Sequence, residues 1–262
     1  MRFLPKWRLR KPAEDARTVY VSEQYGVRSL HIGSDTVQSA MRLARPHDLE
    51  LSYTRAMVGC LLFVPEPKDV LMIGLGGGSV AKFLRLHYPQ TRICVIEIDP
   101  QVVAIARQCF AVPAEDPRFS VIVCDGAEYI SRPAAAADLI MVDGYDAESQ
   151  AKALATTQFY RDCRQRLAQG GMLVANLWGG DREFSAVLKR IGETFPEGTL
   201  CLPARKQGNV IVLAFRDPPG PLRWDELGQR AAELERVLDM EFPEFVAALH
   251  RMNRCDDEYL YP

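Results

Sequence analysis

Hydrophobic and polar positions follow two different patterns along this chain. Near the N-terminus, residues 18–21 and 27–32 alternate between apolar and polar side chains, and a turn at 24–26 separates them, which predicts a β-hairpin. From 49 to 63 the apolar positions follow helical spacing. Residues 1–16 are basic and irregular. We therefore expect a basic tail over 1–16 and a small hairpin-and-helix region over 17–65.

From Asp69 onward, short apolar runs alternate with helical segments. Predicted strands cover 70–73, 92–98, 119–124, 138–142, 172–177 and 209–215, and predicted helices cover 80–86, 101–110, 157–167 and 224–240. Strands that are apolar almost throughout are typical of a parallel sheet covered by helices on both faces. We expect an α/β fold, with an open, mostly parallel Rossmann-like sheet over 66–262, a last strand antiparallel to the others, and a small N-terminal β appendage.

Composition narrows the class of protein. Among 262 residues, 48% are hydrophobic and 25% are charged, which is typical of a globular domain and excludes a disordered chain. The net charge of -2 gives no reason to expect nucleic acid or a membrane surface as a partner. Seven cysteines without a C-x-x-C pair argue against a metal site or a disulfide framework. No apolar run reaches the roughly 18 residues of a membrane span, and no apolar run follows the basic start, so we expect a cytoplasmic protein.

Glycines follow the first strand of the sheet directly. The segment Gly74-Leu75-Gly76-Gly77-Gly78-Ser79 precedes a predicted helix. Glycines there allow a sharp turn and close approach of a ligand, and a helix N-terminus offers free N–H donors. The segment lacks the Lys of a P-loop, which argues against a nucleoside triphosphatase. Gly74, Gly76 and Gly78 are therefore candidate nucleoside-binding positions, and a tight turn without a ligand is the alternative.

Acidic residues stand at the ends of three consecutive predicted strands. Glu97 lies 23 residues after Gly74, where an acid is well placed to bind ribose hydroxyls. Asp125 follows the third strand, and Asp143 and Asp146 follow the fourth. These motifs contain no Lys or Arg, and opposite charges about 4 Å apart attract by about 4 kcal/mol at a near-surface dielectric of about 20. The edge of the sheet therefore favours a cation, such as a sulfonium nucleoside with an amine-bearing substrate, over a pyrophosphate.

These segments together resemble the spermidine synthase (polyamine aminopropyltransferase) family, which has a class I methyltransferase-like fold. The resemblance extends from about Val19 to Phe215. The segments that carry it are 70–78, 95–100, 116–119, 124–126 and 143–146.

The resemblance implies a role for each candidate residue. Asp143 would orient the nucleophilic amine and take its proton, Glu97 would bind the ribose, and Asp125 would bind the adenine amino group. The remaining implied contacts are Gln38 with the adenosyl co-substrate, and Tyr53 and Asp146 with the amine. The resemblance also implies a small-molecule amine acceptor, no metal, and a homodimer as the form that the family often adopts.

Two positions differ from the family pattern. Gly77 stands where the family has an Asp that holds the aminopropyl arm, and Arg55 places a base where the amine pocket has an acid. Aminopropyl transfer from decarboxylated S-adenosylmethionine is the leading interpretation. The alternatives are a methyltransferase that uses intact S-adenosylmethionine and a non-catalytic nucleoside-binding relative.

Overall fold

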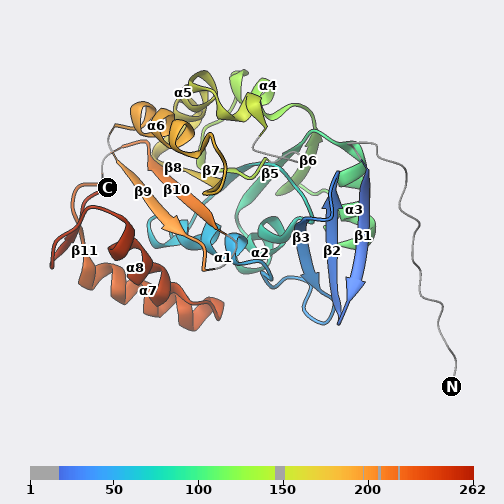
Figure 1. The fold of residues 1–262 in the computed structure, drawn as a ribbon, viewed down its shortest axis with the longest axis horizontal. Coiled ribbons are helices and arrows are strands. Elements are labelled where there is room, and N and C mark those ends of the chain that lie inside the picture. The colour runs from blue at the N-terminus through green and yellow to red at the C-terminus, as the bar shows by residue number, and fades with distance from the viewer. Residues whose placement is uncertain (1–17, 145–150, 197, 206–207, 218) are drawn as a thin grey trace, which may run out of the picture.

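A seven-stranded sheet forms the centre of the molecule (Figure 1). The computed structural model describes residues 18–144, 151–196, 198–205, 208–217 and 219–262. All neighbouring strands are parallel except β10, which is antiparallel to both of its neighbours. In spatial order the strands are β6 (Phe119–Val123), β5 (Arg92–Glu97), β4 (Asp69–Ile73), β7 (Ala137–Val142), β8 (Leu167–Trp178), β10 (Asn209–Phe215) and β9 (Thr199–Pro203). The predicted α/β fold and the antiparallel last predicted strand are confirmed.

Helices cover both faces of the sheet because successive strand residues point to opposite sides. In β4, Val70 and Met72 belong to one buried cluster, and Leu71 and Ile73 belong to the other. The first cluster includes α1 (Ser52–Met57), the 3₁₀ turn Val58–Leu62, α2 (Ser79–His87), α3 (Pro100–Cys109), α7 (Trp224–Leu238) and α8 (Phe242–Met252). The second includes α4 (Gly126–Ser131), the 3₁₀ turn Lys152–Ala155, α5 (Thr157–Arg166) and α6 (Phe184–Thr194).

Small sheets lie at the two ends of the chain. The predicted hairpin is confirmed as β1 (Val19–Gln24) and β2 (Val27–Ile32), and an unpredicted third strand, β3 (Val37–Arg42), extends it. This three-stranded sheet packs on the α3 side of the molecule (Figure 1) through Leu30 and Met41. Near the C-terminus, β11 (Leu222–Arg223) pairs with β12 (Tyr259–Leu260).

The strand order reverses between β4 and β7. From β4 the chain continues to β5 and β6 on one side, and β7 then begins the other side of the sheet. Ligands of open parallel sheets bind at such a point, outside the carboxyl ends of the strands. The ends of β4, β5, β6 and β7 are therefore the place to look for a site.

One lysine is buried where α2 meets the N-terminal sheet. The Lys82 side chain is among the fully buried ones. Its Nζ donates a hydrogen bond to the main-chain oxygen of Phe110 at 2.6 Å and lies 3.2 Å from the Met41 Sδ. Burial lowers the pKa of Lys82 from 10.5 to about 8, because the charged form is poorly solvated there. Lys82 therefore links the N-terminal sheet to the main domain, although burial of its charge costs free energy.

Lys82 gives the stability of the protein a defined pH dependence. Between its folded pKa of about 8 and its unfolded value of 10.5, the unfolded chain binds the additional proton, so stability rises with pH. We expect the free energy of unfolding of the wild type to rise by roughly 1–3 kcal/mol between pH 7 and 10 relative to Lys82→Met, since one pKa unit corresponds to about 1.4 kcal/mol. Urea unfolding at a series of pH values measures this difference, and parallel pH profiles for the two proteins would contradict the assignment.

Candidate active site

A cavity of about 270 Å³ opens at the carboxyl edge of the sheet, where the strand order reverses. Most of the predicted site residues line it, namely Gln38, Tyr53, Gly74, Gly76, Glu97, Asp125 and Asp143. Gly78 does not line the cavity and instead forms the N-cap of α2. Asp146 lies outside the described residues.

Asp143 follows β7 and is partly buried at the wall of this cavity. Its Oδ1 accepts a hydrogen bond from the Asn176 Nδ2 at 2.8 Å. Burial raises the pKa of Asp143, hydrogen bonds from Asn176 and Tyr53 oppose that rise, and the nearby charge of Glu97 adds to it. A carboxylate with a raised pKa that faces a cavity has the properties of a general base.

Glu97 ends β5 and is 8% exposed. Its Oε2 accepts a hydrogen bond from the amide of Leu75 at 2.9 Å, and its Oε1 accepts one from the amide of Asp99 at 3.0 Å. Burial raises the pKa of Glu97, while these main-chain donors lower it. The glycine segment is thus hydrogen-bonded directly to the acid at the end of β5. Asp99 caps α3, since its carboxylate accepts a hydrogen bond from the amide of Gln101.

The carboxylate of Asp125 caps helix α4 and also lines the cavity. It is the N-cap of α4, and its Oδ1 accepts hydrogen bonds from the amides of Ala127 and Glu128 at 2.8 and 3.0 Å. Its Oδ2 accepts none from the part of the chain that the structure describes. The cap therefore orients the carboxylate of Asp125, which also lines the cavity.

Gln38 and Tyr53 approach the cavity from the N-terminal region. The Tyr53 hydroxyl lies 2.9 Å from the main-chain oxygen of Gln38 and also hydrogen-bonds the carboxylate of Asp143. Tyr53 thus links β3, α1 and the end of β7. The N-terminal sheet contributes directly to the site.

The glycine segment is tightly constrained. Gly74 has a φ of 99°, and a Cβ at this position would collide with the main-chain oxygen of Asp143. A side chain at Gly77 would also meet its surroundings, because its Cβ would lie 2.6 Å from the Ser39 Oγ and 2.9 Å from the Phe110 Cδ1. The acid that the family has at position 77 therefore does not fit here unless these neighbours move.

Arg55 does not lie in the cavity. Its Nε is 2.8 and 2.9 Å from the two carboxylate oxygens of Glu241, its Nη2 also contacts that carboxylate, and its Nη1 donates to the main-chain oxygen of Leu49 at 3.2 Å. Glu241 precedes α8 and compensates the charge of Arg55. The expectation that Arg55 brings a base into the amine pocket is therefore wrong.

Sequence reasoning missed two amides behind Asp143. Asn176 is 2% exposed in β8, and its Oδ1 accepts a hydrogen bond from the Nδ2 of Asn209 in β10 at 3.0 Å. The available signal was a single amide inside the otherwise apolar run 172–177. Ile98, which is 64% exposed and lines the cavity, was also missed.

The charged side chains among the described lining residues of the cavity are all acidic. Glu97, Asp125 and Asp143 line it, whereas no Lys or Arg is present among its described lining residues. Within the described ranges, no cluster of three or more His, Cys, Asp or Glu side chains is arranged to hold a metal ion. The arrangement can attract a cationic ligand, bind hydroxyl or amino groups through carboxylates, and accept a proton.

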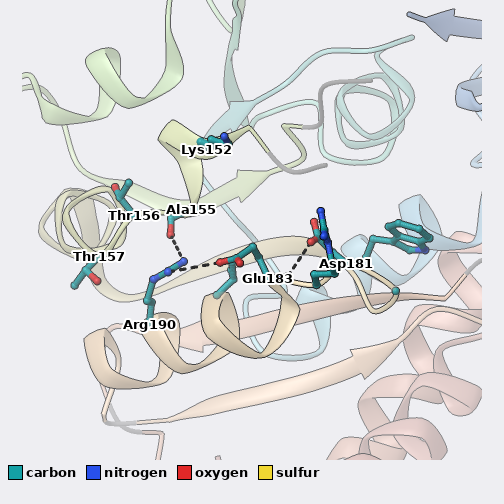
Figure 2. A pocket seen from close by; sticks show the side chains of 11 residues that line it. Lys152, Ala155, Thr156, Thr157, Asp181, Glu183 and Arg190 are labelled. Atoms are coloured by element: carbon teal, nitrogen blue, oxygen red, sulfur yellow. Dashed lines mark hydrogen bonds and ion pairs between the residues drawn. The ribbon is translucent and has the colours of Figure 1, made fainter. Parts of the chain in front are cut away.

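A larger cavity of about 1000 Å³ lies beyond the end of β8 (Figure 2). Arg190 of α6 lies in it, 3.8 Å from the carboxylate of Glu183, and donates to the main-chain oxygen of Ala155 at 3.1 Å. Glu97, Asp125 and Asp143 do not line this cavity. We therefore place the candidate active site in the smaller cavity.

Comparison with known proteins identifies the family. The model of the spermine/spermidine synthase domain matches residues 50–207. The chain belongs to the spermine/spermidine synthase family. It is 42% identical over 247 residues to a polyamine aminopropyltransferase of Chromobacterium violaceum, covering 94% of this chain and 95% of the relative. As a member of this family of aminopropyltransferases, the protein is a transferase.

Solved structures confirm the methyltransferase-like fold of this synthase family member. A probable spermidine synthase from Corynebacterium glutamicum superposes with a TM-score of 0.70 at 21% identity, over 91% of this chain and 94% of that one. Human methyltransferase-like protein 13, solved with SAH, superposes with a TM-score of 0.65 at 26% identity, over 72% and 92% of the two chains. No helix among the described residues is both long and apolar enough to cross a bilayer.

The contact between Gly74 and Asp143 can be tested with a matched pair of glycines. Gly74 and Gly26 both have positive φ, so alanine at either costs about 1–2 kcal/mol of backbone strain. Only at Gly74 does the added methyl group displace Asp143, since nothing lies within 4 Å of a Cβ at Gly26. We expect Gly74→Ala to lower kcat/KM for aminopropyl transfer at least tenfold, whereas Gly26→Ala leaves it within twofold. Equal kinetic losses in the two variants would show that the contact does not position the acid.

Proposed function

We propose that this chain transfers the aminopropyl group of decarboxylated S-adenosylmethionine to a small amine in polyamine biosynthesis. The observation that carries the proposal is the charge of the cavity, where three carboxylates meet without a cationic side chain among the described lining residues. The donor has a sulfonium and an ammonium group, and the acceptor is an amine. Both substrates therefore match this potential, whereas the carboxylate of intact S-adenosylmethionine is repelled by it.

The adenosyl part of the donor would bind between the ends of β4, β5 and β6. Glu97 would accept hydrogen bonds from the ribose hydroxyls, because its side chain is already held by two main-chain amides. The Oδ2 of Asp125 would accept from the adenine amino group. Exposed Ile98 offers an apolar surface for the face of the base, and Gln38 lies across the cavity as a further contact.

Transfer requires an amine with a free lone pair beside the donor. The amine nitrogen attacks the methylene carbon next to the sulfonium, the carbon–sulfur bond breaks, and the sulfur leaves as the neutral thioether of methylthioadenosine. Asp143 takes the proton from the attacking nitrogen, and its raised pKa makes it a stronger base than an exposed carboxylate. Tyr53 and Asn176 hold the carboxylate in place. Positioning of the two substrates supplies the remaining acceleration.

Methyl transfer is the second candidate, because the glycine segment has no acid at Gly77. In the resembled family that acid holds the aminopropyl arm and repels a carboxylate, and here Ser39 and Phe110 occupy its space. The structural likeness to a human methyltransferase-like protein that was solved with SAH agrees with this alternative. Both candidates use the same adenosyl cavity and differ in which carbon of the sulfonium is attacked.

Calorimetric titration with the two donors, followed by product analysis, separates these candidates. We expect decarboxylated S-adenosylmethionine to bind at least tenfold more tightly than the intact form, and incubation with it and putrescine to yield spermidine and methylthioadenosine by mass spectrometry. Glu97→Gln should weaken binding of both donors several-fold, since ribose binding is common to them. Tighter binding of the intact form with release of SAH would establish methyl transfer instead. Failure to bind either donor would contradict both candidates.

A further inference from the structure

Two amide side chains form a line of hydrogen bonds that ends on Asp143. The Asn209 Nδ2 donates to the Asn176 Oδ1 at 3.0 Å, and the Asn176 Nδ2 donates to the Asp143 Oδ1 at 2.8 Å. Asn176 is 2% exposed, whereas Asn209 begins β10 and is partly exposed. The line therefore connects the antiparallel strand of the sheet to the acid that follows β7.

The charge of Asp143 dictates which way each amide faces. An ionised carboxylate can only accept hydrogen bonds, so Asn176 must present its NH₂ group to Asp143. The oxygen of Asn176 then faces β10, where it needs a donor, and Asn209 supplies one. If Asn209 lacked this donor, the buried oxygen of Asn176 would lose the hydrogen bond that it accepts from β10. A flipped Asn176 would turn its oxygen toward the carboxylate and repel it.

We propose that Asn209 is a positioning residue for the transfer reaction, and that it acts through Asn176 to keep the Asp143 carboxylate ionised and oriented toward the amine. Asn209 does not line the cavity, so it has no direct contact with substrates there. Asn209 affects Asp143 by fixing the orientation of the Asn176 amide between them. This inference rests on the proposed function, because it concerns the base of that reaction.

Hydrogen-bond donors and acidic residues both lie near Asp143, and they change its pKa in opposite directions. Glu97 approaches from β5 and Asp125 from the N-terminus of α4, and both are acidic, while Tyr53 of α1 offers its hydroxyl. Burial and the negative charge of Glu97 raise the pKa of Asp143, whereas the donors Asn176 and Tyr53 lower it. Loss of the amide donor therefore shifts the balance toward the protonated, inactive acid.

The test is a double-mutant cycle read out as pH profiles of kcat/KM. We expect Asn209→Leu, which keeps the size of the side chain and removes the donor, to shift the acid limb upward by about half a pH unit. Asn176→Leu should shift it by about one unit, which corresponds to a loss of about tenfold below the limb. The double variant should match Asn176→Leu, because Asn209 acts only through Asn176. Each variant should approach the wild-type rate at high pH.

Asn253→Leu is a matched control that makes the same substitution at another amide donor. The Asn253 Nδ2 bonds the main-chain oxygens of Cys201 and Leu249, so this variant should lower the melting temperature without moving the pH profile. Equal losses of rate at all pH values in Asn209→Leu, or shifts that add in the double variant, would overturn the inference. If the wild type itself transfers no aminopropyl group to putrescine, the proposed function fails. An active wild type with an unshifted Asn209→Leu profile refutes the positioning role alone.

Discussion

The main chains of Gly74 and Asp143 touch where β4 and β7 end, and the rest of the site depends on this contact. The amide of Asp143 donates to the oxygen of Ile73 at 2.9 Å, and the amide of Gly74 donates to the oxygen of Ile96 at 2.8 Å. These bonds join the carboxyl ends of three adjacent strands beyond the last regular pairs. A Cβ at position 74 would separate them, so glycine is required both by its φ and by this close approach.

Three acids gathered in one cavity repel each other, and the fold offsets that repulsion locally. Main-chain amides donate to Glu97 and to Asp125, and the side chain of Asn176 donates to Asp143. These donors carry no net charge, so they stabilise the carboxylates without cancelling the negative potential of the cavity. The same principle explains Arg55, whose charge is compensated by Glu241 away from the cavity. The negative potential therefore remains for cationic substrates.

Much of the fold was predictable because its strands are apolar almost throughout and their ends carry acids. The five parallel strands from β4 to β8, the helices α2, α3 and α5, and the clustering of Glu97, Asp125 and Asp143 follow from local pattern and from the rule for parallel sheets. The short helix α4 and the strands β3 and β9 were missed, since few residues define them. The longer helices α6 and α8 were not predicted either.

The features of the site that the sequence did not predict depend on contacts between residues far apart in the chain. The partner of Arg55 is 186 residues away, so sequence suggested a pocket base where the structure has an ion pair. Asn209 is 33 residues from Asn176 and meets it only because β10 turns back beside β8. The reason for Gly77 also comes from distant residues, Ser39 and Phe110. None of these has a signature in local spacing.

The central claim is that Asp143 is the base of a transfer reaction in this cavity, and single-turnover kinetics of Asp143→Asn test it most directly. Asparagine keeps the size of the side chain but cannot take the proton, and a general base typically contributes about 10²–10⁴ in rate. The account predicts that the rate of the chemical step falls by at least about 10² while the affinity for decarboxylated S-adenosylmethionine stays within about threefold. A single-turnover rate close to that of the wild type would contradict it.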